Sequence, residues 1–144
     1  MPEVTILKGN AFSDQRGTIS FVNDFTFAGV RRFYHIAHAD TRIVRAWQGH
    51  RVEQKYFFVP HGSFLLAWVR IDNWDKPSRD LNAAHIILTD DEPRVVIIPP
   101  GYANGLKALA PGSVLSVYSN LELADSEKDR WSFDQGLWLD WSQF

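Results

Sequence analysis

The chain has 144 residues and carries 15 Lys and Arg against 17 Asp and Glu, a formal net charge of -2. This balance argues against a nucleic-acid-binding protein, which usually shows a basic excess or a clustered basic face. The absence of Cys excludes disulfides, thiolate nucleophiles and zinc ribbons, and a chain of this length predicts one domain over residues 1–144.

Short apolar segments follow one another along the chain, separated by turn residues. Each is about five to nine residues long and rich in Val, Ile, Phe, Tyr or Trp, which is typical of strands rather than helices. Glycine, proline and aspartate cluster between them, as in Asp14–Gly17 and Pro60–Gly62. The pattern predicts an all-β barrel or sandwich with strands within residues 18–25, 30–36, 41–47, 54–59, 63–71, 83–89, 94–100 and 113–119.

The C-terminal part of the chain predicts one helical turn and a final strand. The turn falls at Asp125–Asp129, with Ser126 as a possible N-cap. In residues 136–144, alternation predicts a strand with Leu137, Leu139 and Trp141 on one side and Trp138 and Asp140 on the other. The chain has six Trp, more than one core needs, so we expect some at a subunit contact or ligand wall; core filling is the alternative.

One segment combines charged and aromatic residues, RAWQGHRVEQKYFFVPHG at 45–62, and it is followed about forty residues later by IPPGYANG at 98–105. The pair resembles the two blocks of the cupin superfamily, which implies a jelly-roll β-barrel. Metal-dependent cupins carry His-x-His, then a Glu, then a further His. Here these positions hold Gln48, His50, Glu53 and Asn104, too few good ligands for a metal ion. We therefore expect a site without metal or other cofactor.

Within the cupins, the chain resembles the metal-free group that acts on nucleotide sugars, namely dTDP-4-dehydrorhamnose 3,5-epimerases and dTDP-4-keto-6-deoxyhexose 3,4-ketoisomerases. These families show a DxRG turn, an RGxHxH block, a Lys seven residues before a Gly turn, a VD…SP segment and IPPGxAHG. The resemblance extends over residues 12–133 and implies an isomerase. The five blocks occur here in the same order, at Asp14–Gly17, Arg45–His50, Lys55, Ile71–Ser78 and Ile98–Gly105.

Two positions depart from the epimerase pattern. The His that serves the epimerases as general base falls on Gln48, and an amide cannot take up a proton near neutral pH. Their His after the PxG turn falls on Asn104. We also expect no counterpart of the Asp that orients the epimerase His. The ketoisomerases use the His-x-His pair with a tyrosine, and the resemblance places these roles on His50 and Tyr34.

The resemblance and the chemistry together suggest roles for the candidate residues. Residues 48 and 50 share one face of a strand, so Gln48 and His50 should point the same way, and the resemblance implies that this face points into the barrel. His50 is the best remaining base, and a structural His held by hydrogen bonds is the alternative. Tyr34 is either the acid or a wall residue, while Lys55 could steady an enolate oxygen.

Binding roles are expected for two arginines and two amides. Arg45 and Arg16 could hold a diphosphate, because planar bidentate donors suit phosphate oxygens; a solvated turn charge is the alternative for Arg16. The amides of Gln48 and Asn104 bind hydroxyl groups well. The remaining histidines are expected at the surface or in turns, at positions 35, 38, 61 and 85.

Three functions remain open. The first is a nucleotide-sugar epimerase or ketoisomerase of cell-surface polysaccharide synthesis, the second a catalytically silent sugar- or nucleotide-sugar-binding cupin, and the third a structural subunit. The resemblance also implies a homodimer paired through N-terminal strands. The start of the sequence lacks the basic and apolar regions of a signal peptide, and no apolar run reaches membrane-spanning length. A cytoplasmic protein with no membrane or nucleic-acid partner is therefore expected.

Overall fold

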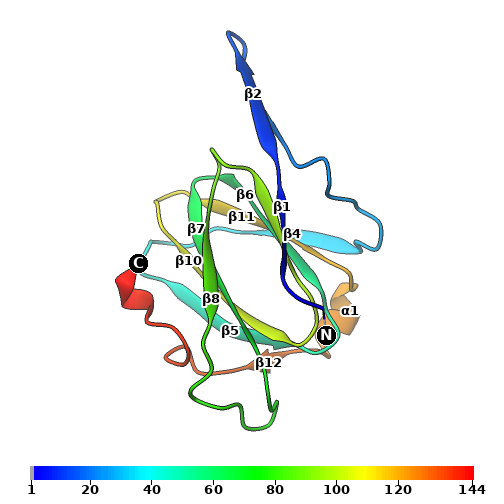
Figure 1. The fold of residues 1–144 in the computed structure, drawn as a ribbon, viewed down its shortest axis with the longest axis vertical. Helices are drawn as coiled ribbons and strands as arrows, with labels where there is room; N and C mark the ends of the chain where they lie inside the picture. Colours follow the sequence, from blue (N-terminus) through cyan, green and yellow to red (C-terminus); the bar gives the residue numbers. More distant parts are fainter. Residues whose placement is uncertain (1) are drawn as a thin grey trace.

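The computed structural model describes residues 2–144 and consists of two antiparallel five-stranded sheets that face each other (Figure 1). One sheet has the order β1 (Thr5–Lys8), β9 (Arg94–Ile98), β6 (Lys55–His61), β11 (Val114–Ser119) and β4 (Arg32–Ile36). The other has the order β12 (Trp131–Ser132), β5 (Val44–His50), β10 (Tyr102–Ala108), β7 (Ser63–Arg70) and β8 (Ala84–Thr89). The all-β jelly-roll prediction is confirmed, and each of the eight expected segments overlaps a strand.

A separate hairpin precedes the barrel strands β4 to β12. It pairs β2 (Asn10–Asp14) with β3 (Gly17–Phe21) and projects away from the two sheets (Figure 1). The expected turn at Asp14–Gly17 forms its tip, and Gly17 has a φ of 134° that favours glycine. The hairpin therefore carries its side chains outside the barrel of the same chain.

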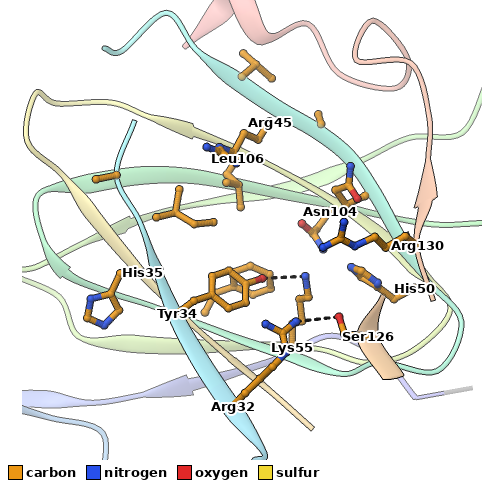
Figure 2. Close-up of a pocket in the computed structure, with 16 residues that line it drawn as sticks. Arg32, Tyr34, His35, Arg45, His50, Lys55, Asn104, Leu106, Ser126 and Arg130 are labelled. Atoms are coloured by element: carbon orange, nitrogen blue, oxygen red, sulfur yellow. Dashed lines mark hydrogen bonds between the residues drawn. The ribbon is translucent and has the colours of Figure 1, made fainter. Parts of the chain in front are cut away.

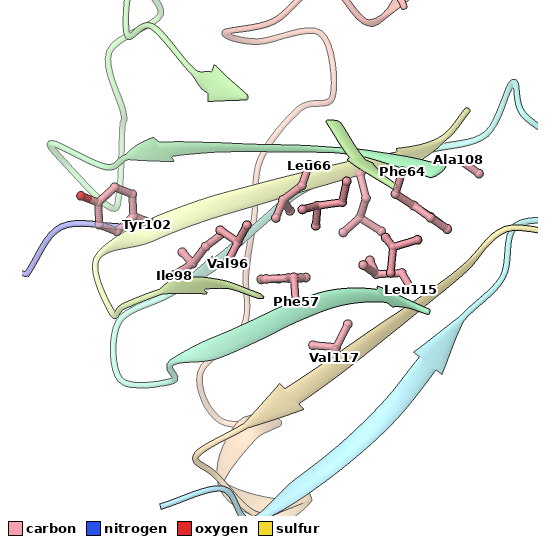
Figure 3. Packing of buried hydrophobic residues seen from close by; sticks show 12 residues of the cluster. Phe57, Phe64, Leu66, Val96, Ile98, Tyr102, Ala108, Leu115 and Val117 are labelled. Carbon is pink, nitrogen blue, oxygen red and sulfur yellow. The ribbon is translucent and has the colours of Figure 1, made fainter. Parts of the chain in front are cut away.

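The main core fills the space between the two sheets. On β7, Phe64 and Leu66 point into this space, because successive side chains of a strand alternate between faces. They meet Phe57 of β6, Val96 of β9 and Val117 of β11 (Figure 3). These side chains form the buried apolar core between the two sheets.

A second apolar cluster lies on the outer face of the β5–β10–β7 sheet. The alternate residues of β7, Leu65 and Ala67, pack here against Trp47 and Trp141. This explains why residues 64–69 are apolar without interruption: the strand is buried on both faces. The C-terminal segment covers this face, and the Trp47 indole donates to the Leu137 carbonyl oxygen at 2.9 Å.

The predicted C-terminal strand is wrong. Trp138 has a φ of 67°, and Trp141–Gln143 form a 3-10 turn, so the alternation of sides does not apply. Residues from both expected sides of that strand, Leu137, Trp138 and Leu139, pack against the second cluster. Much of the tryptophan excess is thus explained by a second core, the alternative to the expected ligand wall or subunit contact.

The expected helical turn is present as α1 (Leu123–Ser126), but Ser126 does not cap it. Ser126 is the last residue of α1, and its hydroxyl is directed at Glu53 instead. Within residues 2–144, no helix has the length and apolar character needed to cross a membrane.

Candidate active site

A cavity of about 680 Å³ opens at the polar end of the barrel (Figure 2); its volume lies within the range of small-molecule sites. Side chains from β4, β5, β6 and β10 line it, together with residues in and after α1. Four of the lining residues are cationic, namely Arg32, Arg45, Lys55 and Arg130, and none is a carboxylate. The cavity is thus suited to an anionic ligand.

His50, at the end of β5, is the buried histidine of this cavity, with 5% of its surface exposed. Its Nδ1 lies 2.8 Å from the carbonyl oxygen of Asp129. Because a carbonyl can only accept, Nδ1 carries the proton and Nε2 carries the lone pair. Among the described residues Nε2 has no hydrogen-bond partner. His50 is therefore held in the tautomer of a general base with a free acceptor nitrogen.

The surroundings of His50 also favour its neutral form. Burial, and after it the positive charge of Lys55, lowers the pKa of His50 below the ordinary value of 6.5. The hydrogen bond to Asp129 and the charges of Glu53 and Asp129 oppose this shift without reversing it. At neutral pH His50 is able to accept a proton.

Asp129 holds the turn that follows His50. Its Oδ1 accepts from the backbone N–H of Arg51 at 2.9 Å, and its Oδ2 accepts from those of Val52 at 2.9 Å and Glu53 at 2.8 Å. One buried carboxylate thus satisfies three consecutive backbone donors, while the carbonyl of the same residue binds His50. This arrangement fixes the end of β5 against the segment after α1.

Lys55 and Tyr34 form a pair on the opposite sheet. Lys55 Nζ donates to Tyr34 Oη at 3.0 Å, and both side chains line the cavity (Figure 2). Because an ammonium group only donates, Tyr34 Oη accepts in this bond and its own proton remains free. The pair presents a cation and a phenol O–H, the two groups that an oxyanion needs.

Gln48 and Asn104 lie opposite each other on β5 and β10. Both line the cavity together with His50, which confirms that residues 48 and 50 share the inner face. Gln48 Nε2 donates to Ser132 Oγ at 3.2 Å, whereas Asn104 is buried. Their amides can bind hydroxyl or carbonyl groups of a ligand but cannot move its protons.

The expected role of Arg16 in this cavity is not met. Arg16 lies at the tip of the β2–β3 hairpin, its side chain is 80% exposed, and it pairs with Asp14 at 2.6 Å. The reason is that the hairpin projects from the barrel, so Arg16 and Arg45 do not meet within one chain. His35 is exposed, as expected, and it is also among the residues that line the cavity.

His38, in contrast to His35, differs from its expectation of a surface position. Its ring packs edge-on against Phe64 with 5.5 Å between centroids, and its nitrogens are buried without a partner among residues 2–144. Sequence reasoning also missed Arg32, Ser126, Asp129 and Arg130 as site residues. The segment Asp125–Arg130 reads as an ordinary charged helical turn, and no motif marks the residues that face the cavity.

Residues 2–144 contain no group of three or more His, Cys, Asp or Glu placed to hold a metal ion. The expected ligand position Glu53 is instead occupied in binding Arg32, Ser119 and Ser126. Metal independence remains a prediction.

Neither a protein-family model nor a curated protein sequence matches the chain. Solved structures do. The rmlC epimerase of Mycobacterium tuberculosis is 18% identical, with a TM-score of 0.77 over 97% of this chain and 74% of the other. The dTDP-4-dehydrorhamnose 3,5-epimerase of Sulfolobus tokodaii is 21% identical, with a TM-score of 0.74 over 96% and 80%.

A ketoisomerase is similar to the chain as well. The 3,4-ketoisomerase QdtA of Thermoanaerobacterium thermosaccharolyticum, solved as a variant with TDP-4-keto-6-deoxyglucose, is 20% identical, with a TM-score of 0.67 over 88% of this chain and 85% of the other. These likenesses show the fold. The chain has the cupin jelly roll that sugar-nucleotide epimerases and ketoisomerases also have.

Proposed function

We propose that the protein is an isomerase of a nucleotide-linked keto sugar, an epimerase or a ketoisomerase of the dTDP-4-keto-6-deoxyhexose type, with His50 as general base. The observation that carries this proposal is the Nε2 atom of His50, which is buried, has no hydrogen-bond partner within residues 2–144 and is fixed as the acceptor by the Nδ1 bond to Asp129. A role in the synthesis of cell-surface polysaccharide follows from the kind of sugar that such isomerases handle.

The proposed reaction begins when His50 Nε2 takes a proton from a carbon next to the ketone. The electron pair of that C–H bond moves to the carbonyl oxygen and gives an enolate, which Lys55 and the phenol of Tyr34 stabilise. Return of a proton to the opposite face of the same carbon gives the epimer. The ketoisomer forms when the hydroxyl proton of that carbon passes to the former carbonyl oxygen, so that the hydroxyl becomes the new ketone, and the former carbonyl carbon takes up a proton. No redox partner is needed.

The four cations of the cavity support a ligand with a diphosphate. Lys55 is engaged with Tyr34, and Arg32 with Glu53 and Ser126. Arg45 and Arg130 are exposed and line the cavity, and we assign the diphosphate to them. Arg130 thereby takes the place that the sequence had suggested for Arg16.

The test is an exchange experiment. The protein is incubated in deuterated water with a dTDP-4-keto-6-deoxyhexose, and the carbons beside the ketone are followed by NMR. Deuterium is expected there above the rate without protein. A catalytically silent binder is the second candidate, favoured by the two amides at Gln48 and Asn104. It is accepted if no keto sugar exchanges while the protein still binds dTDP.

Replacement of Arg45 by Gln is expected to weaken dTDP binding by about 10- to 150-fold, the equivalent of a charged hydrogen bond of about 1.5–3 kcal/mol. Titration calorimetry with dTDP measures the effect. Arg42→Gln is the matched control, because Arg42 pairs with Asp40 and its side chain is 88% exposed outside the cavity. Equal affinities of the two variants would remove Arg45 from the diphosphate site.

We also propose that the protein is a homodimer. The β2–β3 hairpin exposes Phe12 and Ile19 at 59% and 66%, and exposed Phe27 and Phe33 lie near Tyr118 on the outer side of the β4 sheet. Such apolar groups outside a barrel support an interface. Pairing would also give Arg16, which lies outside its own cavity, a second barrel to contact.

Light scattering is expected to give twice the chain mass of 16.5 kDa. The double variant Phe12→Lys with Ile19→Lys should lower that mass toward the monomer, whereas Ile87→Lys on β8 should not. A monomeric wild-type protein at micromolar concentration would contradict the dimer.

A further inference from the structure

Glu53 is a buried carboxylate next to the base that the proposed reaction does not use. Its side chain has no exposed surface, and its Oε1 lies 3.3 Å from His50 Nδ1. It is not among the residues that line the cavity. Glu53 therefore does not touch a ligand in the cavity. It does contact three residues that line the cavity, namely His50, Arg32 and Ser126.

Three donors hold this carboxylate in place. Ser119 donates to Oε2, Arg32 donates to the same oxygen at 3.2 Å, and Ser126 donates to Oε1 at 2.9 Å. Burial raises the pKa of Glu53, but the bond from Ser119 and the charges of Lys55 and His50 outweigh this and leave the pKa below its ordinary value. The group is thus an anion in a fixed position.

A fixed anion beside Nδ1 matters when Nε2 gains a proton. The ring is then an imidazolium with 5% of its surface exposed, and burial penalises that charge. The Asp129 carbonyl already selects the tautomer, so tautomer choice does not require Glu53. The role left for Glu53 is to stabilise the positive charge that the His50 ring acquires when Nε2 takes up a proton.

We propose that Glu53 is a positioning residue that acts through His50, its anchored carboxylate stabilising the imidazolium formed when His50 takes the proton from the sugar. The inference rests on the proposed function, in which His50 is the base. The Arg32 guanidinium donates hydrogen bonds to Glu53 and Ser126. Its positive charge offsets part of the negative charge of Glu53 and so limits how strongly Glu53 favours the protonated ring.

Other charged groups near the His50 ring also influence its pKa. Lys55 on β6 opposes the imidazolium, Asp129 after α1 favours it, and Arg130 lines the cavity nearby. Since these groups are unchanged when Glu53 or Arg32 is replaced, the two variants isolate the effect of this buried pair.

The first experiment measures the pKa of His50 by NMR in the ligand-free protein, with the His50→Asn variant used to assign the signal among the five histidines. Glu53→Gln, which keeps the shape but removes the charge, is expected to lower this pKa by about 1–3 units, as for loss of an opposite charge at this range. Arg32→Gln should raise the pKa of His50, because the positive charge that offsets the Glu53 carboxylate is then removed.

Opposite shifts in the two variants are a readout that loss of packing alone does not produce. If Glu53→Gln does not fold, Glu53→Asp, with the charge drawn back by one methylene, should lower the pKa to a smaller extent, and Arg32→Gln still tests the sign. An unchanged His50 pKa in the Glu53 variant, or shifts of the same sign in both, overturns the proposal.

The second experiment is kinetic. In Glu53→Gln, kcat for exchange should fall about 10- to 100-fold, less than on removal of a general base, while KM stays within about twofold because Glu53 does not touch the substrate. A rise in KM with unchanged kcat would contradict the role. If the His50 pKa responds as expected but wild type shows no exchange, the coupling stands as a property of the fold, and both the proposed reaction and the role of Glu53 in it fail.

Discussion

His50→Asn is expected to abolish deuterium incorporation beside the ketone, with a loss of about 10²- to 10⁴-fold, the range that a positioned general base contributes. Asn fills similar space and can still donate to the Asp129 carbonyl, but it has no basic nitrogen to receive the proton. Binding of dTDP should remain near that of wild type, because Arg45 and Arg130 are untouched. NMR of the sugar and calorimetry with dTDP measure the two quantities separately.

His61→Asn is the matched control, since His61 is exposed at the end of β6 and lies outside the cavity. It should exchange the sugar at the wild-type rate. The wild-type exchange rate should also fall as the pH drops, with a midpoint below 6.5, because burial and Lys55 lower the pKa of His50 and only its neutral form accepts a proton. Exchange that persists in His50→Asn would place the base elsewhere.

The second large effect concerns stability. Asp129→Ala is expected to lower the free energy of unfolding by about 2 kcal/mol or more, because the buried N–H group of Glu53 and the part-buried N–H groups of Arg51 and Val52 lose their acceptor, and a buried donor left unpaired costs about 1–3 kcal/mol. Urea unfolding followed by tryptophan fluorescence measures the difference. The backbone carbonyl that binds His50 is retained.

Asp125→Ala is its control, an exposed aspartate on α1 whose removal should change the free energy of unfolding by no more than about 0.5 kcal/mol. A similar small change for Asp129→Ala would mean that water or a shifted loop satisfies the three donors, and that this carboxylate is not what fixes the turn after β5.

Local patterns in the sequence were sufficient for the fold class and for part of the site. Strands β6, β7 and β9 each contain a run of four or more apolar residues, rich in aromatic or β-branched side chains, and such runs favour a strand in any arrangement that buries them. His50 and Gln48 could be placed on one inner face because the period of a strand is two. Lys55 and Tyr34 came from the resemblance, and the cavity brings them together.

Strand β10 shows where local reasoning failed. Asn104 and Gly105 look like turn residues, yet they lie in the middle of a seven-residue strand. A Cβ atom on Gly105 would come within 2.7 Å of the Trp141 ring and 2.8 Å of Ala46. The glycine is there because a tryptophan from the other end of the chain packs against the strand, which no window around residue 105 contains.

The same limit applies to the polar part of the site. No neighbouring residue in the sequence marks Glu53 as buried. Its partners Ser119 and Ser126 lie 66 and 73 residues away along the chain. Arg16 was a candidate for phosphate binding, but it lies on a hairpin that projects from the barrel. What the sequence by itself determined are properties that depend on neighbours within one strand: the β class and the face that residues 48 and 50 share. The tertiary structure alone decided which charges meet, because a buried charge is tolerated only where distant segments supply its partners.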